Sequence, residues 1–430
     1  MRSEAWSEVQ LGSLLRERPR NGYSPVESAT PTDTLMLGLG CLMPDGFVPR
    51  QLKFAPAGDP TVKSALLTDG DVLVSRSNTR DLVGLAGRYR DVGRPCSYPD
   101  LMMRLRPTGA LNPRFLELVL LNSKARRWFQ ANASGTSGSM VKITADVVCA
   151  TPVPVVSPVE QARITEVLDT VDDTIRETEQ VIAKLEQIKR GLLQDLLTRG
   201  IDDNGEIRDP EQHPEQFKDS AVGRIPTSWT SKSLRELAEV RSGIAKNEGV
   251  PVSNPVEVAY LRVANVQDGY LDLSEMKTLR MTRSEFQNYR VLPGDVLMNE
   301  GGDRDKLGRG AIWRGEFDPC VHQNHVFVVR CGPGLRPEFL DAWTGGTVAK
   351  RYFIVAGKQS TNLASINKTS IGRLPVAVPL LAEQDRSIAA LDVVAAKLAS
   401  ETSELRKFRL LKKGLMDDLL TGRVRVPVSR

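Results

Sequence analysis

The sequence lacks several features that define large classes of protein. Its five cysteines are scattered and form no Cys-x-x-Cys pair, so neither a zinc ribbon nor a disulfide framework is predicted. No run approaches the roughly 18 consecutive apolar residues of a membrane-spanning helix. The amino-terminal stretch MRSEAWSEVQ does not have the pattern of a signal peptide. We therefore expect a cytoplasmic protein that has no membrane partner.

Motifs for catalysis and cofactor binding are also missing. The sequence contains no Gly-x-x-x-x-Gly-Lys-Ser/Thr phosphate loop and no glycine-rich cofactor motif after a strand. Asn112-Pro113-Arg114-Phe115 resembles the Asn-Pro-Pro-Phe/Tyr loop of adenine methyltransferases, but the second proline is absent. The start of a helix that runs to Trp128-Phe129 is the better interpretation. His322 and His325 would point to opposite faces of one strand, and no further metal ligands cluster near them. We expect no catalytic residue, metal or cofactor on this chain.

The length and the net charge of the chain exclude fewer classes of protein. A chain of 430 residues is too long for one hydrophobic core, so two or more domains are expected. A net charge of +5 and a pI near 8.9 permit a polyanionic partner but do not require one.

The most informative feature is a long helical stretch that occurs twice, from Glu160 to Thr198 and from Glu383 to Thr421. Apolar residues recur at heptad spacing in both copies, which is the seam of a coiled coil. Each copy of about 40 residues would extend roughly 60 Å and needs a partner, for which the other copy is available. In the first copy the seam residues are Ile164, Leu168, Val171, Ile175, Ile182, Leu185, Leu192 and Leu196. In the second copy they are Leu391, Val394, Leu398, Leu405, Phe408, Leu415 and Leu419.

Several polar residues and glycines are identical between the copies. The matching pairs are Gln161 and Gln384, Arg163 and Arg386, Lys189 and Lys412, Gly191 and Gly414, and Asp195 and Asp418. Lysine interrupts the seam at the same heptad position in both copies. Shared interruptions indicate duplication more strongly than shared leucines do.

The segments before the helices repeat as well, with a period of about 223 residues. Trp229 matches Trp6, Gly294-Asp295-Val296-Leu297 matches Gly70-Asp71-Val72-Leu73, and Pro337 matches Pro113. Short strand-like runs alternate with helical patterns, so each globule should be a mixed α+β unit. The predicted order is globule 1–155, helix 156–200, polar linker 201–228, globule 229–380, helix 381–424 and tail 425–430.

This combination resembles the specificity subunit of type I restriction-modification systems over almost the full length. The resemblance rests on the segments that enter each helix, 152–163 and 375–386, on the helix exits 189–198 and 412–421, and on the linker string 208–229. It implies two target-recognition domains separated by two long helices packed as an antiparallel coiled coil, in a pseudo-twofold repeat. Each domain would read half of a bipartite, asymmetric site in double-stranded DNA. The helices would bind methyltransferase subunits, with two copies expected, and the complex would recruit restriction subunits that translocate DNA.

Candidate DNA contacts lie in two polar loops of each globule. The loop after the Gly-Asp-Val-Leu strand is rich in hydrogen-bond donors, and a second loop offers small residues and lysine for phosphate contacts. A solvated hairpin is an equally open interpretation of the first loop, and a plain helix-to-strand connector is slightly favoured for the second. The candidates are Arg76, Asn78, Arg80, Lys142, Arg304, Lys306, Arg309, Lys358 and Asn362.

The matching polar residues of the helices are the candidates for partner contact, on the expectation that they are exposed. They are Gln161, Arg163, Lys189, Gln384, Arg386 and Lys412. We expect a non-catalytic subunit that recognises DNA and assembles a complex. Two alternatives stay open, namely an enzyme that itself methylates or cuts DNA, and a coiled-coil scaffold that does not bind DNA.

Overall fold

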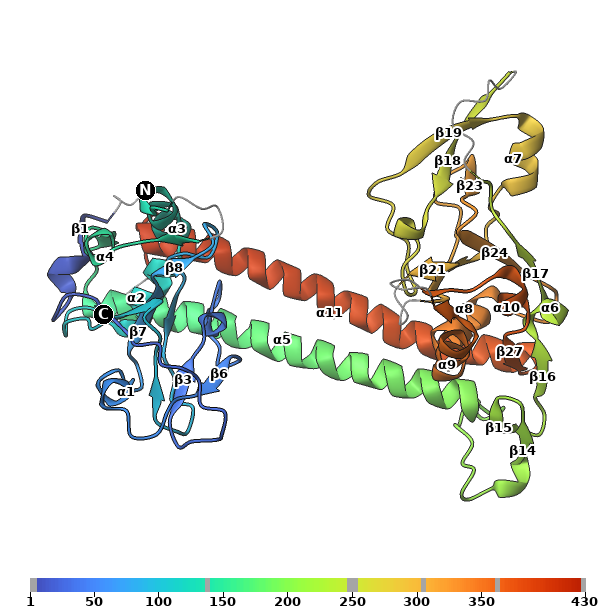
Figure 1. The fold of residues 1–430 in the computed structure, drawn as a ribbon, viewed down its shortest axis with the longest axis horizontal. Helices are drawn as coiled ribbons and strands as arrows, with labels where there is room; N and C mark the ends of the chain where they lie inside the picture. The colour runs from blue at the N-terminus through green and yellow to red at the C-terminus, as the bar shows by residue number, and fades with distance from the viewer. Residues whose placement is uncertain (1–5, 136–139, 246–253, 303–306, 360–363, 427–430) are drawn as a thin grey trace. The chain divides into compact units, whose positions relative to one another are not determined.

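The computed structural model describes residues 6–135, 140–245, 254–302, 307–359 and 364–426. The chain forms two compact units. Unit 1 comprises Met1–Gln180 with Ser403–Arg430, and unit 2 comprises Val181–Thr402. Each unit contains a globule of helices and sheets together with half of each of two long helices, α5 (Pro158–Thr198) and α11 (Leu381–Thr421) (Figure 1). Both helices have 41 residues, which confirms the predicted repeat of a long helix.

The globule of unit 1 is built on a four-stranded antiparallel sheet in the order β2-β11-β7-β9. A second sheet has the order β10-β3-β6, in which β10 runs parallel to β3. The strands of these sheets are β2 (Arg20–Asn21), β3 (Leu35–Leu37), β6 (Leu52–Phe54), β7 (Val72–Ser75), β9 (Ala86–Arg88), β10 (Cys96–Ser97) and β11 (Met102–Leu105). Three small pairs add β1 (Glu8–Gln10) with β13 (Pro152–Pro154), β4 (Leu42–Met43) with β5 (Gly46–Phe47), and β8 (Ser77–Asn78) with β12 (Val141–Lys142).

Four short helices complete this globule: α1 (Pro60–Ser64), α2 (Pro113–Leu121), α3 (Ser123–Asn132) and α4 (Ala145–Cys149). The sequence predicted one continuous helix from Asn112 to Phe129, and that prediction is wrong. The backbone is extended at Asn122, whose side chain accepts a hydrogen bond from the Lys124 amide and so caps a new helix. Asn112 caps α2 in the same way, ahead of a proline at the first helical position.

Unit 2 repeats this topology. Its four-stranded sheet has the order β17-β24-β20-β22, and its second sheet pairs β18 with β23 in parallel and with β19 in antiparallel. The strands are β16 (Thr230–Ser233), β17 (Ala238–Arg241), β18 (Val256–Leu261), β19 (Lys277–Met281), β20 (Val296–Asn299), β21 (Gly301–Gly302), β22 (Gly310–Ile312), β23 (Cys320–His322), β24 (Val326–Cys331), β25 (Lys358–Gln359), β26 (Ala364–Ser365) and β27 (Pro375–Val378). The helices are α6 (Leu234–Leu237), α7 (Arg283–Tyr289), α8 (Pro337–Gly345), α9 (Thr347–Ala356) and α10 (Lys368–Gly372).

The polar linker also has structure. It contains a hairpin of β14 (Phe217–Ser220) and β15 (Gly223–Pro226) within unit 2. An ion pair of 2.5 Å between Arg208 Nη1 and Glu383 Oε1 fixes the linker to the first turn of α11. The amide of Ile201 donates to the same carboxylate at 3.0 Å.

The long helices are part of the hydrophobic core of both units. In unit 1, Ile164 and Leu168 of α5 share a core with Leu419 and Leu420 of α11. In unit 2, Leu197 of α5 belongs to the core of the second globule, where the other end of α11 also lies. All the predicted seam residues are buried or half-buried, as a paired coiled coil requires. Among the described residues, no helix is long and apolar enough to cross a membrane.

Candidate nucleic-acid interface and partner surface

The structure joins the two candidate loops of unit 1. The chain leaves β7 at Arg76 and enters β8, which pairs with β12 so that Asn78 faces Val141 and Ser77 faces Lys142. Lys142 also exchanges two backbone hydrogen bonds with Ser134, of 2.8 and 2.9 Å. Segments that lie far apart in the sequence therefore form one antiparallel ribbon at the end of the central strand. We call this the reading ribbon of unit 1.

Unit 2 has the equivalent reading ribbon. After β20 the chain passes through Glu300 into β21, which pairs with β26, and β26 in turn pairs with β25. Lys358 lies opposite Ser365 in this ribbon, whereas Ser134 lies opposite Lys142 in unit 1. Each ribbon thus pairs one exposed lysine with one exposed serine, but the lysine is on opposite strands in the two units. Such lysines are suited to contact phosphate. The two ribbons carry this positive charge on different strands.

The remaining candidates of unit 1 lie around its ribbon. Arg80 is exposed and donates to the carbonyl of Gln130 on α3 at 3.1 Å. Asn78 is half-buried and caps the amide of Thr79. The sequence analysis did not identify Arg126, which donates to the carbonyls of Asp81 and Val83 and so fixes the loop after β8 to α3. Burial lowers the pKa of Arg126. A helical arginine gives no sequence signal for this role.

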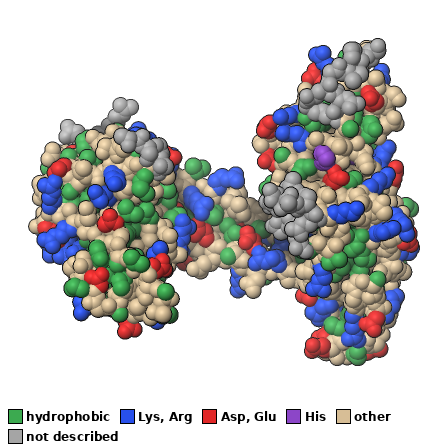
Figure 2. Space-filling model, in the orientation of Figure 1, with side chains coloured by type: hydrophobic (Ala, Val, Ile, Leu, Met, Phe, Trp, Pro, Cys, Tyr) green, Lys and Arg blue, Asp and Glu red, His purple; other side chains and the backbone are tan. Residues whose placement is uncertain are grey.

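In unit 2, Arg309 is half-buried and donates to the side chain of Gln267 at 3.1 Å. The predicted contacts Arg304, Lys306 and Asn362 lie outside the described residues. DNA contact by the whole candidate set stays a prediction. On the face drawn in Figure 2, lysine and arginine side chains are interspersed with aspartate and glutamate, so no broad basic field marks a DNA-binding side there.

His322 and His325 do not share one strand, which corrects the sequence interpretation. His322 ends β23, and His325 lies in the turn before β24. His322 is buried, its Nδ1 lies 2.6 Å from the carbonyl oxygen of Val326, and burial lowers its pKa to about 4. His325 is exposed, and its Nδ1 lies 2.5 Å from Oε2 of Glu300. The two rings therefore occupy unrelated environments.

The glutamines predicted to contact a partner are buried, so the expectation that they are exposed is wrong. Gln161 accepts a hydrogen bond from the Asn112 amide and donates to the carbonyls of Ala110 and Val156. Gln384 makes the same three bonds in unit 2, to the Arg336 amide and to the carbonyls of Gly334 and Pro379. Their identity has an intramolecular cause, because each glutamine ties the loop before a globular helix to the start of a long helix.

The two seam lysines differ. Lys412 is buried, with Nζ 2.6 Å from Asp172 on α5, whereas Lys189 is exposed. The position equivalent to Asp172 is Ala395, so the second copy lacks the acid that pairs with Lys412 in unit 1. Among the arginines, Arg163 is half-buried and Arg386 pairs with Asp203 at 2.8 Å.

An exposed stripe on each long helix carries a stronger partner signal, which the sequence analysis missed. On α5 it comprises Lys184, Ile188 and Gly191, and on α11 it comprises Lys407, Leu411 and Gly414. All six are exposed, and a side-chain carbon added at either glycine would meet no atom within 4 Å. The sequence did contain a signal for these stripes, because Ile188 and Leu411 are apolar residues that lie outside the heptad seam.

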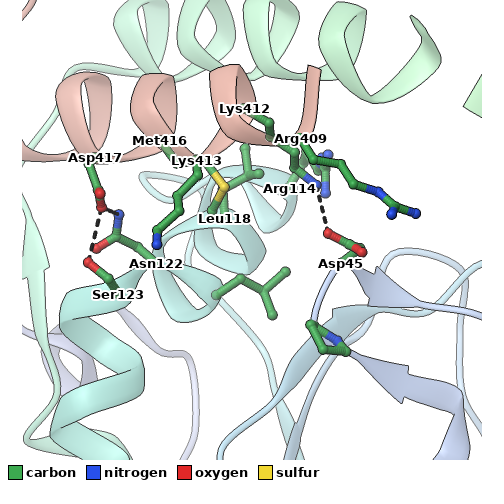
Figure 3. A pocket seen from close by; sticks show the side chains of 12 residues that line it. Asp45, Arg114, Leu118, Asn122, Ser123, Arg409, Lys412, Lys413, Met416 and Asp417 are labelled. Atoms are coloured by element: carbon green, nitrogen blue, oxygen red, sulfur yellow. Dashed lines mark hydrogen bonds and ion pairs between the residues drawn. The ribbon is translucent and has the colours of Figure 1, made fainter. Parts of the chain in front are cut away.

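A groove of about 290 Å³ lies next to the stripe in unit 1, between the globule and the second half of α11 (Figure 3). At one end, Asp417 accepts hydrogen bonds of 3.0 Å from Asn122 and Ser123. At the other, Arg114 pairs with Glu117, Asp169 and Asp172 at 2.5–2.7 Å. Burial opposes the charge of Arg114, but these carboxylates outweigh burial and raise its pKa. The groove is also lined by Pro44, Leu118, Leu121, Arg409, Lys413 and Met416.

Comparisons with known proteins agree with this architecture. No protein-family model matches the chain. It is 25% identical over 211 residues to the putative MjaX specificity subunit of Methanocaldococcus jannaschii, a match that spans 48% of this chain and about half (49%) of that relative. The StySPI specificity subunit of Salmonella potsdam is 22% identical over 342 residues, covering 79% of this chain and 68% of the relative.

A solved structure supports the fold. It comes from work on complex assembly and conformational transition of the type I restriction-modification system, and it covers 99% of this chain and 100% of its own with a TM-score of 0.61 at 17% identity. In sequence the chain is thus similar to type I restriction-modification specificity subunits, and its duplicated α+β globules and paired long helices have the fold of the solved structure.

Proposed function

We propose that this chain is the non-catalytic DNA-recognition subunit of a type I complex, in which each unit reads one half of a bipartite, asymmetric target. The main support is the pair of reading ribbons, which share a backbone frame but carry different side chains. A shared frame presents side chains to DNA in the same manner, and different side chains select different bases. Under this proposal the chain itself holds no cofactor, and its partner subunits perform the chemistry.

Methyltransferase binding is assigned to the exposed stripes of the long helices. A glycine inside a helix is unfavourable by about 1 kcal/mol relative to alanine, so two equivalent open glycines need another explanation. Contact with a partner helix provides one, because a glycine lets two backbones approach closely. Since both units carry the stripe, two methyltransferase copies would bind, and restriction subunits would join through them.

The decisive experiment is co-expression with the cognate methyltransferase, followed by modification-sensitive sequencing of the host genome. We expect one bipartite, asymmetric motif, and deletion of this chain should abolish the mark. A stable complex of the two proteins that methylates no such motif would contradict the proposal.

The stripes are tested by the bulky substitutions Gly191→Leu and Gly414→Leu in the full chain. Each should reduce the number of bound methyltransferase copies from two to one in native mass spectrometry, and the double variant should bind none. Glu177→Leu is the matched control, because it adds the same exposed leucine to the other half of α5. Retention of both copies by the folded double variant would exclude the stripes as the binding surface.

A further inference from the structure

Arg76 and Glu300 occupy the same backbone position in the two units. Each follows the last residue of a central strand, β7 or β20, and precedes the first strand of a reading ribbon. The Arg76 amide donates to Leu101 at 2.8 Å, and the Glu300 amide donates to His325 at 2.9 Å. Their carbonyls accept from the amides of Ile143 and Ile366, at 2.9 and 2.7 Å. The frame around this position is therefore the same in both units.

The side chains at this shared position have opposite charge. The glutamines that tie each globule to its long helix keep their chemistry between the units, since Gln161 and Gln384 make three equivalent hydrogen bonds each. The residue whose amide donates to the carbonyl of Arg76 or Glu300 is also the same in both units, since Ile143 and Ile366 are both buried isoleucines. A charge reversal inside a constant frame suits a position that selects between ligands, provided that the side chains are not fully used by contacts within the chain.

Both side chains have further hydrogen-bond donors or acceptors with which they could bind a partner outside the chain. Arg76 Nη1 makes a long contact of 3.4 Å with the carbonyl of Asp100, which occupies one of the five donors of a guanidinium. One oxygen of Glu300 accepts from His325, while a carboxylate offers further lone pairs on both oxygens. The side chains of Glu300 and His325 are 29% and 55% exposed, so solvent reaches this pair.

We propose that this position reads a base in each half-site, with Arg76 selecting guanine and Glu300 selecting cytosine. Arginine donates to O6 and N7 of guanine in the major groove, and glutamate accepts from the N4 amino group of cytosine. Phosphate would repel a carboxylate, so Glu300 suits a ribbon on DNA only where it faces a base edge. His325 is a positioning residue that orients the carboxylate. The inference rests on the proposed DNA-recognition function.

The test uses Arg76→Gln and Glu300→Gln in the full chain, assembled with its methyltransferase. Glutamine keeps a polar side chain of similar length but prefers adenine. Binding of each purified complex to DNA pools randomised around the wild-type motif gives the base preference at every position. We expect each variant to lose roughly 5- to 150-fold discrimination at one base pair, in one half-site only. The two variants should affect different half-sites.

Matched controls are Arg18→Gln, in an exposed ion pair of unit 1, and Asp219→Asn, in the exposed linker hairpin. Both should leave the motif unchanged. His325→Ala should weaken discrimination at the same base pair as Glu300→Gln. If both glutamine variants fold and keep every wild-type preference, the inference is overturned. If one variant does not fold, the variant in the other unit decides.

Failure of the inference differs from failure of the proposed function. A wild-type complex that selects no sequence from the pools would overturn DNA recognition by this chain. A wild-type complex that selects a bipartite motif, together with variants that select the same motif, would overturn only the role of Arg76 and Glu300.

Discussion

In both units a globular helix packs against the long helices, but the two units place different charged residues at this contact. In unit 1, Glu117 on α2 is paired with Arg114 and also accepts from the Arg88 amide at 2.8 Å. In unit 2, the equivalent residues are Asp341 and Glu338 on α8. Asp341 is one methylene shorter, has a second acid in place of the arginine, and keeps one buried carboxylate oxygen without a hydrogen-bond partner.

This difference shows which contacts between a globule and the long helices the fold requires and which can vary. The glutamine ties at Gln161 and Gln384 are the same in both units, so they are part of the frame. Within the described part of unit 2, Asp341 forms no ion pair equivalent to the network around Arg114, so the frame does not depend on that network. Burial accordingly raises the pKa of Asp341 to about 6, whereas the network keeps the acids of unit 1 beside a buried cation.

Removing Arg114 should have the largest effect on stability. Arg114→Leu leaves Glu117 and Asp169 without their shared cation, whereas Asp172 keeps Lys412, and breaking such a buried network costs about 3–5 kcal/mol. Hydrogen exchange measured along the chain by mass spectrometry should show lost protection in unit 1 only, because the units need not unfold together. Arg336→Leu is the control, since its exposed pair with Asp385 should contribute far less. Equal losses for both variants would contradict this account.

The glutamine ties should matter equally in both units. Gln161→Leu and Gln384→Leu each leave one amide and two carbonyls without a partner, at a cost of about 2–3 kcal/mol in the affected unit. Denaturant unfolding of each variant, followed by hydrogen exchange, measures the loss. A large loss for one variant and none for the other would show that the equivalent bonds do not have equivalent roles.

Asp341→Asn should stabilise unit 2 by about 1–2 kcal/mol at neutral pH, the smallest effect of the three. The pKa of Asp341 lies near 6 in the folded chain, above the ordinary value of 3.8, so the folded state binds its proton more tightly. Between these two pH values the wild-type chain should therefore lose stability as pH rises, and the variant should lose less. The measurement is the unfolding midpoint as a function of pH. Parallel pH profiles of the two proteins would refute it.

Periodicity predicted the largest elements well. The heptad rows identified both long helices and their buried seam, because a pattern sustained over many turns outweighs local exceptions. The division of the first globular helix at Asn122 was missed, since an asparagine cap and a solvated helical asparagine look alike in sequence. The turn between His322 and β24 was missed for a similar reason, because short strands leave little periodic signal.

The sites were harder to predict because they depend on pairing between distant segments. The repeat indicated which loops correspond, but only the ladders of β8 with β12 and of β21 with β26 show that two loops form one ribbon. Identity between the helix copies was misleading for Gln161 and Gln384, since sequence does not separate an exposed polar residue from a buried one. Lys189 and Lys412 share a heptad position, yet Lys412 is buried beside Asp172 and Lys189 is exposed.

The strand that begins each globule lies beside the strand that ends it. β1 pairs with β13, and β16 pairs with β27 along Thr230–Val378, Ser231–Ala377, Lys232–Val376 and Ser233–Pro375. The chain thus leaves the helical frame and returns to it at almost the same place, the geometry that lets a domain be exchanged without disturbing its host. In the gene, the DNA that encodes the segment between these two β-strands could therefore be exchanged as one unit. Recombination at its borders would replace one globule and preserve the glutamine tie that fixes the globule to its helix. Under the proposed function it would also change the sequence that one unit recognises.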